Sequence, residues 1–150
     1  TIPLVLLNLL INDYIFNVVL YTIVLIWTTD TFAYFGGKAI GKRPLSDISP
    51  KKTVEGAVIG LVMCVVVALV YRLIFIPEIS IIDAVITGIG IGFFGQVGDL
   101  FESILKRYVD EKDSSGLIPG HGGVLDRFDS LIFVSPFVYI YYTYVRFLIN

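Results

Sequence analysis

A polar segment between two long apolar runs, residues 116–130 with the sequence GLIPGHGGVLDRFDS, carries the residue types that phosphate and metal chemistry need. It holds four glycines, the chain's one histidine (His121), and the carboxylates of Asp126 and Asp129. A glycine-rich backbone can present consecutive N–H groups to an anion, as phosphate-binding loops do. Carboxylate oxygens suit hard divalent cations such as Mg²⁺. The segment therefore predicts a loop that binds phosphate groups and a divalent metal.

Asp99 supplies another carboxylate, at the end of an apolar run that starts near Ile81. A charged group in that position is costly unless it faces water, a metal or another partner, and this favours a functional role. Asp99 and Asp126 come from separate segments and together could hold a metal whose shell is completed by substrate oxygens. Asp129 could contribute too, or it could cap the final helix, because it lies just before the last apolar run.

Basic residues near these carboxylates could neutralise phosphate charge, with arginine binding in bidentate fashion. Around the polar segment they are Lys106, Arg107, Lys112 and Arg127. An earlier loop adds Ser49, Lys51 and Lys52. Ser49 followed by Pro50 resembles a helix start, which would place both lysines in the first helical turn. The alternative for this loop is an ordinary basic connection that fixes membrane topology.

One face of the helix expected near Asp99 is lined by small residues. The spacing of four, three and four residues places on one helical face Gly88, Gly92, Gly95 and Asp99, and Ser103 and Lys106 extend it if the helix continues. This face could lead to a site at the carboxylate, or the glycines could only allow close helix packing. Asp30, inside another apolar run, could belong to the site or pair with a loop lysine.

The composition points to a membrane protein. Of the 150 residues, 56% are apolar and 16% charged, and the mean hydropathy is +0.85. Soluble domains are about one quarter charged. The net charge of −2 gives no indication of nucleic-acid binding. The single cysteine, Cys64, excludes a disulfide within the chain and reads as a buried apolar residue. Neither a P-loop spacing nor a nucleophile elbow is present in the sequence.

Four runs are long enough to cross a bilayer, which takes about 20 apolar residues. They are approximately 14–34, 54–76, 81–100 and 131–149. Residues 1–11 could complete an earlier span, and we expect the chain to be the carboxy-terminal part of a longer protein. The predicted fold class is all-α: a polytopic transmembrane helical bundle of about four full spans plus a partial first one. Residues 1–150 are expected to form a single membrane-embedded domain.

The second and third spans are joined by only residues 77–80, which predicts a tight helical hairpin. The loops 36–53 and 101–130 must then face the same side of the membrane. The first loop carries five Lys and Arg residues and the second four, which makes nine of the eleven in the chain. The positive-inside rule places both loops in the cytoplasm, and we expect the two loops to form the site.

Several polar residues in this region have a spacing that resembles a known family. The long signature of the phosphatidate cytidylyltransferases (CDP-diacylglycerol synthases) is similar to Ser103-Ile-Leu-Lys-Arg107, Lys112-Asp113, Pro119-Gly-His-Gly-Gly123 and Asp126-Arg-Phe-Asp129. Two upstream stretches, Gly98-Asp99 and Ile48–Gly56, also look like that family. The resemblance covers about residues 27–130.

The resemblance implies transfer of a cytidylyl group from CTP to phosphatidic acid, with pyrophosphate released. It implies Mg²⁺ held by Asp99 and Asp126, leaves open a second, monovalent cation such as K⁺, and implies a homodimer. It further implies catalytic or substrate-binding roles for Asp99, Asp126, Lys106, Arg107, Ser103, Lys112, Asp113, His121, Gly122, Gly123, Arg127, Ser49, Lys51 and Lys52. We expect an integral protein of a bacterial inner membrane, with no nucleic-acid partner.

Two alternatives remain open from the sequence. A CTP-dependent polyprenol or dolichol kinase would transfer the γ-phosphoryl group instead. An ion-coupled transporter subunit would use Asp30 and Asp99 as intramembrane ion sites, although transporters place such groups near the bilayer midplane.

Overall fold

The computed structural model describes the backbone of residues 13–46, 49, 52–108 and 124–145. Side chains are described in these ranges except at 13–15, 105–108 and 124–129. The described part of the chain is helical apart from its connections. Its elements are α2 (Asp13–Ile40), α3 (Val54–Phe75), α4 (Ile81–Tyr108), α5 (Val124–Ile140) and a π-helical turn, η2 (Tyr141–Val145). The predicted all-α class is confirmed.

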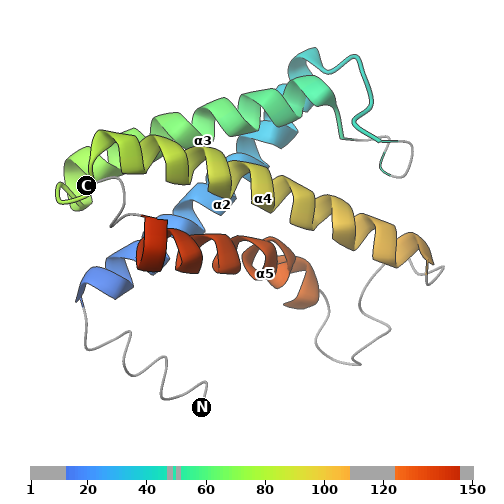
Figure 1. The fold of residues 1–150 in the computed structure, drawn as a ribbon. Coiled ribbons are helices and arrows are strands. Elements are labelled where there is room, and N and C mark those ends of the chain that lie inside the picture. The colour runs from blue at the N-terminus through green and yellow to red at the C-terminus, as the bar shows by residue number, and fades with distance from the viewer. Residues whose placement is uncertain (1–12, 47–48, 50–51, 109–123, 146–150) are drawn as a thin grey trace.

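Consecutive helices run in opposite directions, as Figure 1 shows. The carboxyl ends of α2 and α4 and the amino ends of α3 and α5 therefore lie at one end of the bundle. The loop between α2 and α3 lies at this end, and the short α3–α4 turn lies at the other. The predicted hairpin of two spans is confirmed, because α3 ends at Phe75 and α4 begins at Ile81.

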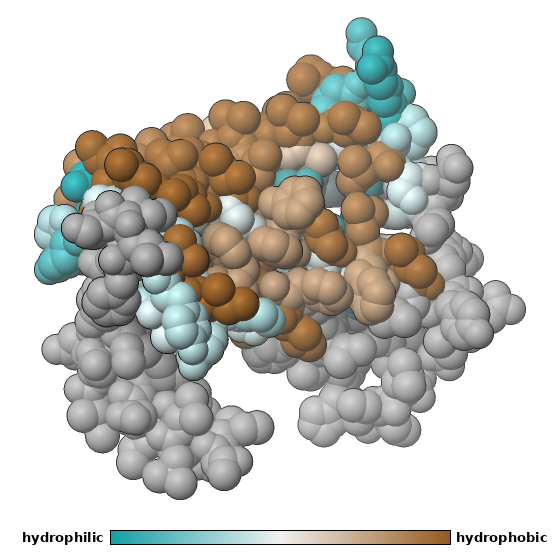
Figure 2. Space-filling view, viewed as in Figure 1, coloured by the Kyte–Doolittle hydropathy of each residue, from teal (hydrophilic) through white to brown (hydrophobic). Residues whose placement is uncertain are grey.

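Three helices are long and apolar enough to cross a membrane: Phe16–Ile40, Val54–Phe75 and Ile81–Ile104. A shorter apolar helix follows at Ser130–Val145. The fourth predicted span is thus represented by this shorter helix in the described residues, and residues 146–150 and the partial span 1–11 lie outside them. Figure 2 shows apolar side chains over the visible faces of α3 and α4, with hydrophilic ones gathered at the α2–α3 loop.

The helices extend further than the apolar runs that predicted them. α2 continues to Ile40, so Gly36, Gly37 and Lys38 are helical and not part of a loop. α4 continues to Tyr108, and α5 already begins at Val124. The length of an apolar run reports only the part of a helix that lies in the hydrocarbon core. The helix can continue beyond that core, into the polar interface, where its polar side chains are hydrated.

α3 shows how sequence spacing sets the packing. Its buried residues, Gly56, Gly60, Cys64 and Ala68, recur every four positions. The exposed valines Val58, Val62, Val66 and Val70 recur at the same interval on another face. One stripe of small residues therefore meets other helices, while a β-branched stripe is left for lipid. The buried position of Cys64 confirms its predicted role as a small core residue.

Close approach of α2 and α3 depends on glycine. A Cβ placed on Gly56 would lie 2.5 Å from the carbonyl oxygen of Ala33, and one on Gly60 would lie 2.8 Å from that of Thr29. In α4, a Cβ on Gly88 would lie 3.0 Å from the Cα of Val65 in α3. The helix-packing interpretation of the glycine-lined face of α4 is confirmed at Gly88.

α5 packs on α4 at the end of the bundle where the long loops leave. The hydroxyl of Ser130 donates to the carbonyl oxygen of Gly95 at 3.4 Å. Pro136 lies inside α5 and removes the N–H that would bond to Ile132. The Ser135 hydroxyl donates to that carbonyl at 3.4 Å, as expected for a proline kink in a membrane helix.

Candidate functional site

A pocket of about 610 Å³ opens between α2, α3, α4 and the loop that joins α2 to α3. It lies at the end of the bundle where both long loops leave the helices. Its walls are formed by Asp30, Ala33, Tyr34, Gly37, Lys38, Leu45, Ser49, Lys52, Thr53, Ala57, Gln96 and Asp99. The pocket therefore combines an apolar wall from the helices with charged and amide groups at the mouth of the bundle.

The loop that closes one side of the pocket is held by backbone hydrogen bonds. The amide of Leu45 donates to the carbonyl oxygen of Lys52 at 2.7 Å, and the amide of Val54 donates to that of Arg43 at 3.0 Å. Pro44 and Thr53 form an isolated antiparallel bridge. These bonds fold the loop back on itself and fix the backbone that carries Lys52.

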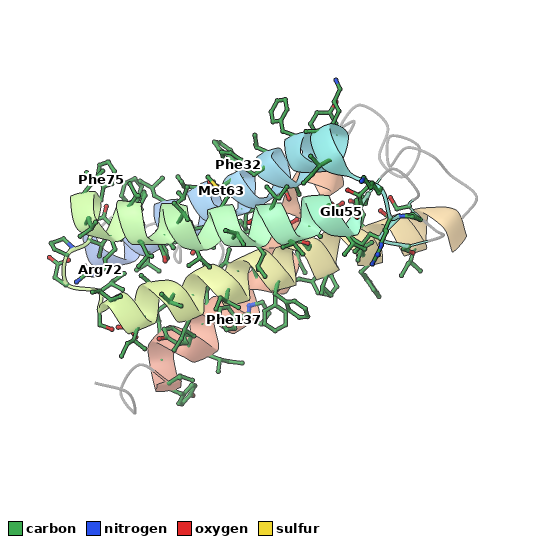
Figure 3. All side chains as sticks on the ribbon, turned by 90° about the horizontal axis from the view of Figure 1, so that it is seen from above. Phe32, Glu55, Met63, Arg72, Phe75 and Phe137 are labelled. Carbon is green, nitrogen blue, oxygen red and sulfur yellow. The ribbon has the colours of Figure 1, made fainter. Side chains whose placement is uncertain are left out.

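Glu55, in the first turn of α3, anchors the start of the same loop. Its Oε2 atom accepts hydrogen bonds from the backbone amides of Lys42 at 3.1 Å and Arg43 at 3.2 Å. Figure 3 shows Glu55 at the loop end of α3, with Arg72 and Phe75 at the opposite end. The two backbone amides of the loop just beyond α2 find their acceptor in this carboxylate.

The predicted helix start at Ser49 and Pro50 is wrong. Ser49 and Lys52 are not helical, and α3 begins at Val54 with Thr53 as its N-cap. The Thr53 hydroxyl accepts from the amide of Gly56 at 3.2 Å. Thr53 has an extended backbone and its oxygen reaches the third helical residue, which is the geometry a cap requires. Lys52 therefore precedes the helix and is free to point across the pocket.

Lys52 and Asp99 meet across the pocket. The Nζ atom of Lys52 lies 2.6 Å from Oδ2 of Asp99, and the two side chains are 29% and 39% exposed. This ion pair joins the α2–α3 loop to α4. Partial burial weakens the screening by solvent, so the pair is stronger than one on an open surface. The sequence placed both residues in the site but did not predict that they touch.

Gln96 is a wall residue that sequence reasoning missed. Its Nε2 atom donates to the carbonyl oxygen of Ala57 at 3.0 Å, which ties α4 to α3 beside the pocket. It precedes Asp99 by three residues and so lies on the same helical face. That spacing was the available signal. Lys38 was missed as a site residue because the first span was expected to end near residue 34, and Tyr34 lay at that expected end.

The described residues bring together only part of the predicted site. Asp99, Lys52 and Ser49 line one pocket, together with Asp30. The Ser103 hydroxyl donates to the carbonyl oxygen of Asp99 at 2.9 Å within α4. Lys106 and Arg107 belong to α4, and Asp126 and Arg127 to α5, but their side chains lie outside the described part. Outside the described residues altogether are Lys51, Lys112, Asp113, His121, Gly122 and Gly123.

Asp129 does not cap the final helix. α5 begins at Val124, five residues earlier, so Asp129 lies within the helix. The prediction was wrong because the helix starts in the polar segment and not at the edge of the apolar run.

The donor atoms around the pocket suit a hard cation. Asp30 and Asp99 offer carboxylate oxygens, Gln96 an amide oxygen and Ser49 a hydroxyl. Within the residues whose side chains are described, no three acidic, histidine or cysteine side chains converge as a complete metal site. A positive charge already lies against Asp99, in the form of the Lys52 ammonium. A metal here would need a ligand from a further segment or from a substrate.

Fold and pocket define the class: a helical protein with three candidate membrane spans and a charged pocket where those spans end. A model described as "Cytidylyltransferase family" matches residues 4–145. The chain therefore belongs to the cytidylyltransferase family, and the predicted family relationship is confirmed.

Curated relatives agree with this assignment. The chain is 48% identical over 130 residues to the phosphatidate cytidylyltransferase of Bacillus subtilis, covering 86% of this chain and 48% of that protein. It is 46% identical over 123 residues to the phosphatidate cytidylyltransferase of Staphylococcus saprophyticus, covering 81% and 47%. With phosphatidate cytidylyltransferase 4, chloroplastic, of Arabidopsis thaliana it shares 49% identity over 112 residues, covering 74% and 28%. The chain thus spans about half the length, or less, of these relatives.

Proposed function

We propose that this chain provides the catalytic part of a phosphatidate cytidylyltransferase. The reaction would transfer a cytidylyl group from CTP to phosphatidic acid, giving CDP-diacylglycerol and pyrophosphate. The observation that carries this proposal is the pocket in which Lys52 meets Asp99 at the mouth of a membrane bundle, in a chain nearly half identical to proteins of that name.

The chemistry fits the groups in the pocket. The phosphate of phosphatidic acid is already an anion and can attack the α-phosphorus of CTP without a general base. The leaving pyrophosphate takes the electron pair of the broken P–O bond. The protein must hold the two phosphates in line and offset the repulsion between them. Lys52 and Lys38 bring positive charge to the pocket wall for that purpose.

Further residues, most of them outside the described side chains, would complete the contacts to the substrates. We infer these roles for Lys106, Arg107, Lys112, Arg127, His121, Ser103, Asp113, Gly122, Gly123, Ser49 and Lys51. α4 carries two of these cations just beyond Asp99, and α5 carries Arg127 at its amino end, which is at the same end of the bundle.

Mg²⁺ would be held by Asp99 from α4 and Asp126 from α5. When bound, it would supply electrostatic stabilisation of the triphosphate and its leaving group. The packing of α5 on α4, where the Ser130 hydroxyl donates to the carbonyl oxygen of Gly95 one turn before Asp99, supports this pairing. A second, monovalent cation remains part of the proposal, because a site crowded with carboxylate and phosphate oxygens can hold more than one cation.

The pocket would face the cytoplasm of a bacterial inner membrane, where CTP is available, and the protein would act as a homodimer. The basic residues of the α2–α3 loop support this orientation. A pocket at the bundle end allows a water-soluble nucleotide to meet a lipid headgroup that stays in the bilayer.

The reaction is tested with the purified protein in detergent, phosphatidic acid and Mg²⁺, using CTP labelled on either the α- or the γ-phosphorus. Transfer of the α-label into the lipid phase, with the γ-label remaining in water, is the expected result. Transfer of the γ-label would instead mean a lipid kinase. Absence of both labels from the lipid, with a folded protein, would overturn the proposed reaction.

A further inference from the structure

The ion pair between Lys52 and Asp99 occupies the carboxylate proposed to hold the metal. The Lys52 Nζ atom is 2.6 Å from Asp99 Oδ2, well within the N···O distance of about 4 Å that defines an ion pair. Mg²⁺ binds carboxylate oxygens at about 2.0–2.1 Å. A divalent cation on either oxygen of this carboxylate would lie a few ångströms from the ammonium, and the two positive charges would repel each other. Metal and lysine therefore compete for Asp99.

Lys52 can leave Asp99 without any change in the fold. Its backbone is fixed by the bond between the Lys52 carbonyl and the Leu45 amide and by the neighbouring cap at Thr53. The side chain has four rotatable bonds and is 29% exposed along its length, although the Nζ atom itself is buried against Asp99. Moving the ammonium therefore requires only rotation within a pocket of about 610 Å³.

We propose that Lys52 exchanges partners during loading of the site. Without metal it pairs with Asp99, and when the metal takes Asp99 it pairs with a substrate phosphate. The inference rests on the proposed function, since it takes Asp99 as a metal ligand and a phosphate as the second partner. Lys52 keeps the carboxylate neutralised in the empty site and delivers a positive charge to the phosphate only once the metal is in place.

Metal binding without substrate measures this exchange directly. Mn²⁺ serves as the probe for the Mg²⁺ site, and the free ion is followed by electron paramagnetic resonance with the protein in a phosphate-free maltoside detergent. Lys52→Met removes the competitor, so the apparent Mn²⁺ affinity is expected to rise about fivefold. Asp99→Asn is expected to abolish this binding.

Lys38→Met is the matched control. Lys38 lines the same pocket and carries the same charge, but the structure pairs Asp99 with Lys52. Losing Lys38 should raise the Mn²⁺ affinity less than twofold, because only the general field of the pocket changes. Equal gains in both variants would show a field effect and overturn the exchange.

Cytidylyl transfer should change in the opposite direction from metal affinity. Lys52→Met is expected to lower the transfer rate about a hundredfold, because a charge that stabilises the reacting phosphates is lost. If Lys52 had a purely structural role, its replacement would lower both the metal affinity and the transfer rate. Tighter metal binding together with slower transfer is therefore the signature of the exchange.

A measurement on the unaltered protein covers the case in which the Lys52 variant does not fold. Pulse acetylation of amines, read by mass spectrometry, should modify Lys52 faster once Mg²⁺ is added and more slowly when CTP is added with it. Lys38 provides the internal reference for the Mg²⁺ step. Unchanged Lys52 reactivity on Mg²⁺ addition would contradict the exchange. Unaltered protein that transfers cytidylyl groups but binds no Mn²⁺ would instead refute the metal assignment of the proposed function.

Discussion

At the scale of single residues, the site depends on side chains that hold backbone in place as much as on those that would meet substrate. Glu55 is an example, because its carboxylate accepts hydrogen bonds from two backbone amides of the α2–α3 loop. This contact joins residues that are distant in sequence and carry no motif of their own. Lys52 lies in the returning half of the same loop, where its carbonyl oxygen accepts from the amide of Leu45. The position of its ammonium therefore depends on the half of the loop that Glu55 anchors.

Replacing Glu55 with alanine should impair transfer without disturbing the helices. The loop would lose two hydrogen bonds, and a shift of about 1 Å in a reacting group can cost as much as a hundredfold in rate. We expect a loss between tenfold and a hundredfold for Glu55→Ala. Glu55→Gln keeps an acceptor oxygen and should lose less. Transfer assays on both variants, with circular dichroism to check helix content, test this; equal rates in Glu55→Ala and the unaltered protein would contradict it.

At the scale of elements, the distance between α2 and α3 sets the width of the pocket. Gly56 and Gly60 allow α3 to contact the backbone of α2. The contact of Gly56 is with Ala33 and Gly37, which also line the pocket wall. Gly95, on α4, is less crowded, since a Cβ there would meet only a methyl group of Val134 at 3.8 Å. Glycines of different helices should therefore respond differently to the same substitution.

Gly56→Ala should destabilise the protein and Gly95→Ala should not. Alanine in place of glycine favours a helix interior by about 1 kcal/mol, a gain that applies in full to Gly95 in the middle of α4, whereas Gly56 lies in the first turn of α3. At Gly56 the added methyl would clash with the Ala33 carbonyl and push α2 and α3 apart, costing about 1–3 kcal/mol. Thermal unfolding in detergent should show a lower midpoint for Gly56→Ala alone. Equal midpoints for the two variants would refute the role assigned to this packing.

The sequence predicted which segments form the apolar helices, three of them long enough to cross a membrane, but not where those helices end. Apolar run length reports the hydrocarbon thickness, and this located Val54–Phe75 within one residue. It could not show that Gly36 to Ile40 continue α2 or that α5 starts at Val124, because the polar interface tolerates helix and loop alike. Thr53, and not Ser49, became the cap because the loop pairs Pro44 with Thr53, a contact that local sequence does not encode.

For the candidate site, the sequence predicted individual residues but not the contacts between them. Asp99 stood out because charge at the end of an apolar run needs a reason, and Lys52 because it lies in a basic loop that could neutralise phosphate charge. Their pairing, and the presence of Gln96 and Tyr34 in the same wall, depends on how three helices and a folded loop meet. Such contacts follow from tertiary packing and have no counterpart in residue spacing along one segment.

At the scale of the whole molecule, the two ends of the bundle carry different polar groups. Opposite the pocket, Asp83 is fully buried and accepts a hydrogen bond from the Tyr141 hydroxyl at 2.6 Å. Its other oxygen accepts from the Ser80 amide at 3.3 Å, and the Tyr21 hydroxyl lies 2.8 Å from that of Thr87 one turn further along α4. This network joins α2, α4 and η2. We therefore assign a structural role to this end of the bundle and the proposed chemistry to the end that carries the pocket.

The transfer rate of Asp99→Asn, compared with Tyr141→Phe, tests the central claim most directly. Asp99→Asn keeps the shape of the side chain and removes the charge proposed to hold Mg²⁺, so Mg²⁺-dependent transfer of α-labelled CTP should fall at least about a hundredfold while the protein stays folded. Tyr141→Phe removes a hydrogen bond worth about 1 kcal/mol in a membrane bundle, which should lower the unfolding midpoint and leave the rate unchanged below it. Full transfer by Asp99→Asn would contradict the account and remove the catalytic site from this pocket.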